Sequence, residues 1–116
     1  MSLRVHGIAP CDTCRKARRW LIEQGIDFDW ADLRADGIDA ARIRDWLERV
    51  EPARLLNRRS TTWRRLPEDR RPAPDDPELA GFLATHPTLI KRPVFERGDE
   101  VVVGFGDDAR AWLARR

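Results

Sequence analysis

Residues that bind metals or form cross-links are scarce in this sequence. Its 116 residues include only two cysteines and two histidines. The histidines, His6 and His86, are far apart and lack the spacing of zinc ligands, so we expect no metal site. With one cysteine pair and no sign of a secretory context, a structural disulfide is not expected either.

Long apolar segments and an excess of one charge are also missing. No stretch approaches the roughly 20 apolar residues needed to cross a bilayer, and the residues after Met1 lack the core of a signal peptide. Charged residues make up 36% of the chain, yet the net charge is only +2. Such a balance offers little of the attraction to phosphate that nucleic-acid binding depends on. We therefore expect a cytoplasmic protein that binds neither membranes nor nucleic acid directly.

The two cysteines form the most informative motif of the chain. Cys11 and Cys14 are spaced as C-x-x-C, between a predicted strand and a predicted helix. The start of a helix offers unpaired N–H groups and partial positive charge, which stabilise a reactive thiolate. A redox pair is therefore the favoured interpretation. Ordinary packing cysteines, half of a zinc site and a structural disulfide are the alternatives, and the polar Asp12 and Thr13 disfavour the first.

Hydrophobic periodicity predicts strands and helices in alternation. The first strand, a helix ending at Gly25 and the second strand are expected to form a parallel pair with a helical crossover. Residues 53–74 are expected to be irregular, and Asp107 or Asp108 is expected to cap the last helix. A short strand followed by a loop is predicted over 3–8, further strands at 26–31, 93–96 and 100–103, and helices at 15–24, 39–50, 75–86 and from 107 onwards.

This order of elements predicts an α/β protein with a thioredoxin-like fold. A β-α-β half at the N-terminus and a β-β-α half at the C-terminus are the two parts of that fold. The connection between them is longer than the single helix it requires. We therefore predict one domain over residues 1–116, with a helical lobe inserted at about 32–86.

Several short motifs resemble the arsenate reductase-like (ArsC) family of the thioredoxin superfold, which also contains the Spx regulators. The resemblance covers nearly the whole chain and is strongest to the YffB-type branch. The motifs that carry it are Gly7-Ile8, Cys11-Asp12-Thr13, Lys16–Leu21, Leu55-Leu56-Asn57, Thr61–Arg64, Leu89–Pro93 and Val103-Gly104-Phe105.

The resemblance implies roles for individual residues. Cys11 corresponds to the nucleophile, and Arg92 to an anion-binding arginine that precedes a cis-proline, Pro93. Cys14, absent from many family reductases, is either a resolving cysteine or a packing residue.

Two further anion-binding arginines of the arsenate reductases have no direct counterpart. Asn57 takes the place of one of them, with Arg59 close by in the sequence. Residues 104–106, Gly-Phe-Gly, take the place of the other. Stable binding of arsenate is therefore not expected.

The resemblance implies a thiol-dependent reductase that acts on an oxidised sulfur or an oxyanion. It needs no bound cofactor or metal, and glutathione is the expected co-substrate, with glutaredoxin as a possible protein partner. The alternative is a redox-switched regulator that binds RNA polymerase, as Spx does. The motif around Trp63 favours the reductase branch.

Overall fold

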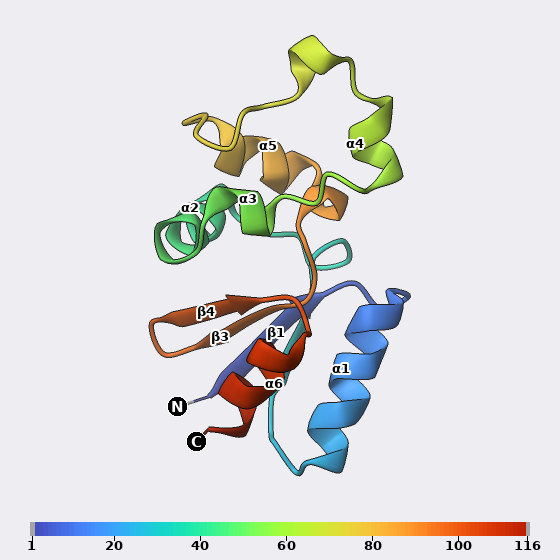
Figure 1. Cartoon of the computed structure of the whole chain (residues 1–116), viewed down its shortest axis with the longest axis vertical. Coiled ribbons are helices and arrows are strands. Elements are labelled where there is room, and N and C mark those ends of the chain that lie inside the picture. The colour runs from blue at the N-terminus through green and yellow to red at the C-terminus, as the bar shows by residue number, and fades with distance from the viewer. Residues whose placement is uncertain (1, 116) are drawn as a thin grey trace. The chain divides into compact units, whose positions relative to one another are not determined.

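The computed structural model describes residues 2–115, which divide into two compact units (Figure 1). The first unit combines the N-terminal segment up to Asp32 with the C-terminal segment from Arg92 onwards. The second unit comprises Leu33–Lys91. Each unit is described separately below.

A four-stranded mixed sheet forms the centre of the first unit (Figure 1). Its strands are β1 (Leu3–Gly7), β2 (Asp29–Asp32), β3 (Val94–Arg97) and β4 (Glu100–Val103), in the order β2-β1-β3-β4. β1 and β2 are parallel, as predicted, while β3 is antiparallel to both β1 and β4. The predicted hairpin of the C-terminal half is therefore present.

Helices α1 (Asp12–Glu23) and α6 (Asp107–Ala114) cover the same face of this sheet. Val5 and Phe95 are register partners on β1 and β3, so their side chains point to one side. Both belong to a single buried core that also receives side chains from the two helices. The helical members of that core are Ala17, Leu21, Ala109, Trp112 and Leu113. The arrangement is the thioredoxin-like fold that the sequence predicts.

Two element boundaries in the first unit differ from the prediction. The first helix begins at Asp12 instead of residue 15, with Cys11 as its N-cap. The second strand begins at Asp29 instead of residue 26, because the N–H of Ile26 donates to Leu21 O (2.9 Å) and so belongs to the helix ending. That ending contains Gly25 in the left-handed conformation (φ +67°), as expected for a C-terminal cap.

The prediction that Asp107 or Asp108 caps the last helix, α6, is wrong. Its N-cap is Gly106, and no side chain caps it. Asp107 and Asp108 follow in the first turn, where their negative charges interact favourably with the helix dipole.

The second unit consists of short helices. They are α2 (Ala40–Arg49), α3 (Pro52–Leu55), α4 (Thr61–Arg65), α5 (Leu79–Thr85) and two 3₁₀ turns, Glu68–Arg70 and Pro87–Leu89. Helices α2 and α5 pack together, and the buried residues of the unit include Ile43, Trp46, Leu55, Leu79, Leu83 and Leu89.

The prediction that residues 53–74 are irregular is wrong, since α3, α4 and one 3₁₀ turn lie there. Pro52 occupies the first turn of α3, where its missing N–H costs nothing. Ser60 caps α4, because its Oγ accepts a hydrogen bond from Trp63 N at 3.1 Å. Helix α5 begins at Leu79, four residues later than predicted.

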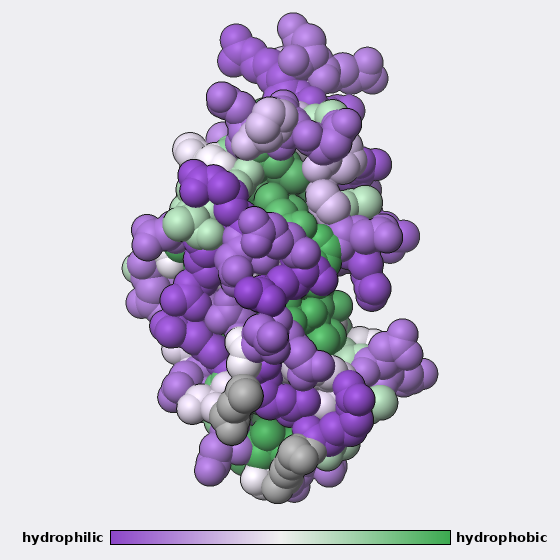
Figure 2. All heavy atoms as spheres, turned by 90° about the vertical axis from the view of Figure 1, so that its left-hand side faces the viewer, coloured by the Kyte–Doolittle hydropathy of each residue, from purple (hydrophilic) through white to green (hydrophobic). Residues whose placement is uncertain are grey.

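Hydrophilic residues dominate the face seen in Figure 2, in keeping with the large charged fraction of the chain. Among residues 2–115, no helix is both long and apolar enough to cross a bilayer.

Candidate active site

Cys11 sits at the N-terminus of α1, in extended backbone (φ −73°, ψ 125°). Its N–H donates to Ile8 O at 3.0 Å, which closes a tight turn between β1 and the helix. Its carbonyl accepts the first helical hydrogen bond, from Arg15 N at 2.9 Å. The residue is partly exposed. This position gives a thiolate the benefit of the unpaired N–H groups of the first turn.

The surroundings of Cys11 favour the thiolate. Burial raises the pKa of the Cys11 thiol, but this is outweighed by hydrogen bonds from the Cys14 backbone and side chain and from Arg92, and by the charge of Arg92. The pKa is therefore lowered below its usual value. Arg15, in the first turn of the same helix, pairs with Asp12.

The surroundings of Cys14, in contrast, favour the protonated thiol. Its side chain is completely buried, and burial raises the pKa of the Cys14 thiol to about 12, with a further contribution from Cys11. Neither cysteine is in a disulfide. The two thiols therefore differ: the thiolate is favoured at Cys11, and the protonated thiol is favoured at Cys14.

Gly7, at the end of β1, makes room for Cys14. A Cβ atom at this position would lie 2.6 Å from Cys14 Sγ and 2.8 Å from Cη2 of Trp30. Both distances are far below van der Waals contact. Gly7 is therefore needed here because the buried sulfur and the indole ring occupy the space of a side chain.

Replacing Gly7 by alanine should destabilise the protein by about 1–3 kcal/mol, the usual cost of overpacking a core. Thermal and denaturant unfolding would measure the loss. Gly81→Ala is the matched control, because nothing lies within 4 Å of a Cβ at this exposed position in α5. It should be neutral or mildly stabilising, since alanine is the better helix former. Equal stability of the two variants would contradict the packing argument.

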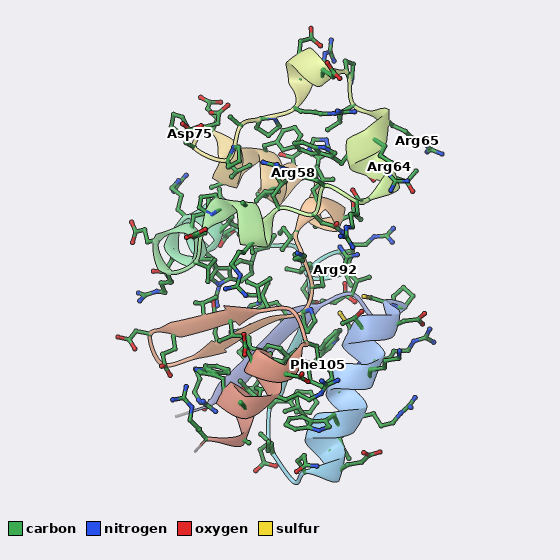
Figure 3. All side chains as sticks on the ribbon, in the orientation of Figure 1. Arg58, Arg64, Arg65, Asp75, Arg92 and Phe105 are labelled. Atoms are coloured by element: carbon green, nitrogen blue, oxygen red, sulfur yellow. The ribbon has the colours of Figure 1, made fainter. Side chains whose placement is uncertain are left out.

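Arg92 and Pro93 come from the segment that leads into β3 (Figure 3). The peptide bond between them is cis, as predicted. Arg92 hydrogen-bonds to the side chain of Cys11, while Pro93 is buried and its carbonyl accepts a hydrogen bond from Gly104 N at 2.8 Å. The first unit thus brings Cys11, Cys14, Arg92 and the loop after β4 into one region.

The loop after β4 contributes an aromatic ring at the place where the resemblance implies an arginine in the arsenate reductases. The ring of Phe105 contacts Trp20 edge-on at 5.7 Å between centroids and lies 6.4 Å from the ring of Phe95. The guanidinium of Arg110 lies over the same ring at 4.5 Å and also pairs with Asp107. Phe105 is therefore a packing residue of the core, and Arg110 already has partners.

The other two predicted anion-binding residues belong to the second unit. Asn57 holds a local turn: its N–H donates to Leu89 O at 2.7 Å, and its Oδ1 accepts from Arg59 N at 3.1 Å. The Arg59 side chain is exposed. A role for either residue in anion binding stays a prediction.

The two histidines lie in different units. His86 follows the last residue of α5, and its Nδ1 lies 3.1 Å from Phe82 O at the carbonyl end of the helix. His6 is buried on β1, with Nε2 3.4 Å from a carboxylate oxygen of Glu96.

One residue near the site was not predicted from the sequence. Asp32, the last residue of β2, accepts a hydrogen bond from Ala9 N at 3.0 Å through Oδ2. Ala9 lies in the loop that leads to Cys11. The signal was available: β1 and β2 were predicted to be parallel, and the carboxyl ends of parallel strands meet at the same edge of a sheet.

A thiolate-forming cysteine at the start of the first helix, with a cis-proline segment beside it, places the first unit among proteins of the thioredoxin-like fold. Within that class, residues 6–111 match the ArsC family. The chain therefore belongs to the ArsC family.

Three relatives illustrate the range of the family. The solved structure of the YFFB protein is 38% identical, covers 97% of this chain and 98% of its own, and superposes with a TM-score of 0.88. An arsenate reductase (ArsC) related protein from Brucella melitensis is 40% identical, covering 98% of this chain and 96% of its own, with a TM-score of 0.75. The global transcriptional regulator Spx of Streptococcus pyogenes is 27% identical over 90% of this chain and 80% of its own.

Proposed function

We propose that this protein is a thiol-dependent oxidoreductase that reduces a small disulfide through Cys11 and Cys14. The observation that carries the proposal is the opposite shift of the two thiols, with the pKa lowered at Cys11 and raised at Cys14. A thiolate at neutral pH is the species that attacks sulfur. The name of the Brucella relative, an arsenate reductase related protein, supports a reductase.

In the first step the Cys11 thiolate attacks one sulfur of the substrate disulfide. A Cys11–substrate mixed disulfide forms, and the other half of the substrate leaves as a thiolate. Arg92 is placed to interact with negative charge at this centre, because it already hydrogen-bonds to the Cys11 side chain.

In the second step Cys14 resolves the adduct. Once Cys11 is in a mixed disulfide it carries no charge, so its contribution to the raised pKa of Cys14 disappears. Cys14 then attacks Cys11 Sγ while its proton passes to the leaving sulfur of the substrate, which gives the Cys11–Cys14 disulfide and releases the second half of the substrate as a thiol. Two molecules of glutathione, or a glutaredoxin, return the pair to the dithiol form. This cycle needs no bound cofactor and fits the reducing cytoplasm.

Disulfide reduction should be readily measurable, whereas arsenate reduction should be weak or absent. The reason is that Phe105 packs into the core at a position where an anion-binding arginine is expected. A turnover assay with each substrate, with and without glutathione, would check this. Brisk arsenate turnover would show that another arginine binds the oxyanion, and loss of both activities would argue against a reductase.

The second candidate is a redox-switched regulator that binds RNA polymerase. It is favoured by the 27% identity to Spx over most of the chain. A pull-down of polymerase subunits with the reduced and the oxidised protein separates the two candidates. Retention that depends on the state of Cys11 and Cys14, without turnover of any disulfide, would favour the regulator.

A further inference from the structure

The loop that carries Cys11 is joined to the sheet by a carboxylate. The parallel ladder of β1 and β2 ends with the pair Gly7 and Asp32, and β1 then leaves the sheet. Ala9 lies beyond this last pair, so the ladder itself offers no acceptor for its N–H. Asp32 Oδ2 supplies it at 3.0 Å. The side chain thus replaces the backbone carbonyl that a longer β2 would have provided.

Besides this bond, the backbone of Ile8 hydrogen-bonds to the side chain of Cys14 in α1. Pro10 has no N–H, and the N–H of Cys11 is used within the turn, on Ile8 O. The internal bond fixes the shape of the turn but not its position relative to the sheet. The bond from Ala9 to Asp32 fixes that position, and a hydrogen bond to an ionised acceptor is stronger than a neutral one.

The position of the turn decides how well the Cys11 thiolate is stabilised. Arg92 lies just before β3 and is not part of this loop. Its hydrogen bond to Cys11 requires the sulfur to be within a few tenths of an ångström of its place. We propose that Asp32 is a positioning residue: by holding Ala9, it keeps Cys11 Sγ within reach of Arg92. The inference rests on the proposed role of Cys11 as the nucleophile.

The direction in which the pKa of Cys11 shifts distinguishes a positioning role of Asp32 from a direct electrostatic one. The negative charge of Asp32 by itself opposes a thiolate, so removing only that charge would lower the pKa of Cys11. Loss of positioning would raise it, because the hydrogen bond from Arg92 would be weakened. The charged residues of the first turn of α1, Asp12 and Arg15, pair with each other and are unchanged in the variants below.

The experiment measures the rate of Cys11 alkylation against pH, by iodoacetamide labelling and peptide mapping, in three variants. Asp32→Ala removes the acceptor and should raise the apparent pKa of Cys11 and slow its alkylation at pH 7 about tenfold, since small displacements of a reacting group have large effects on rate. Asp32→Asn keeps an acceptor oxygen and should stay close to wild type. Asp29→Ala removes the same charge from the exposed first residue of β2 and should change nothing.

Amide hydrogen exchange at Ala9 should accelerate in Asp32→Ala but not in Asp29→Ala. A fall in melting temperature with an unchanged pKa of Cys11 would mean that Asp32 is only structural, and would overturn the proposal. A lowered pKa in both Asp32 variants would also overturn it, in favour of direct electrostatics. The readout needs no substrate, so failure of disulfide turnover in the wild type would contradict the proposed function and leave this test intact.

Discussion

Cys11→Ser should abolish disulfide reduction, whereas Cys14→Ser should still react once with the substrate. A serine hydroxyl does not ionise near neutral pH, so the loss in turnover at Cys11 is expected to be about a thousandfold or more. Without Cys14 the mixed disulfide on Cys11 cannot be resolved internally, so it should accumulate. Intact-protein mass spectrometry after addition of a disulfide substrate would detect the adduct.

The two thiols should also differ in their pH dependence. Because its pKa is lowered, Cys11 should be alkylated at lower pH than an ordinary cysteine, and its rate should level off at a pH below its usual pKa. Cys14, with a pKa of about 12, should remain unlabelled over the same range. Preferential labelling of Cys14, or an adduct on Cys14 in the wild type, would reverse the assignment of nucleophile and resolving cysteine.

The fold was predictable because its main signals are local. The alternation around Val5, the C-terminal cap at Gly25 and the turn at Gly98 each specify an element or its end without reference to the rest of the chain. The prediction for residues 53–74 was wrong because this segment lacks such local signals. Helices as short as α4 depend on one cap and one buried side chain, here Ser60 and Trp63, and such helices leave no periodic pattern to detect.

The site was predictable only in part. The C-x-x-C spacing pointed to Cys11 at the helix start, but the different pKa values of the two thiols depend on burial, which spacing does not give. Gly7 and Asp32 contribute through packing and a single long-range hydrogen bond. The predicted parallel pairing brings the ends of β1 and β2 to the same edge, but the individual contacts of Gly7 and Asp32 also depend on the register of the two strands.

Arg92→Ala should leave the fold intact and weaken the reaction at Cys11 in two ways. The pKa of Cys11 should rise, because a hydrogen bond and a positive charge that lower it are both lost. Binding of an anionic substrate or of glutathione should weaken by roughly 1.5–3 kcal/mol, the value of a hydrogen bond to a charged group. Arg92→Lys should restore only part of either effect, since an ammonium lacks the planar fork of guanidinium.

The pH profile of Cys11 alkylation and the KM for glutathione measure these effects in parallel. Lys91→Ala is the matched control, because it removes one positive charge from the preceding, exposed residue, whose side chain is not among the groups that shift the pKa of Cys11. It should leave both quantities near their wild-type values. If Lys91→Ala and Arg92→Ala shift the profile equally, the effect is one of general charge and Arg92 has no specific contact with the sulfur. If Arg92→Ala shifts neither quantity, the thiolate is stabilised by Cys14 and the helix N-terminus alone.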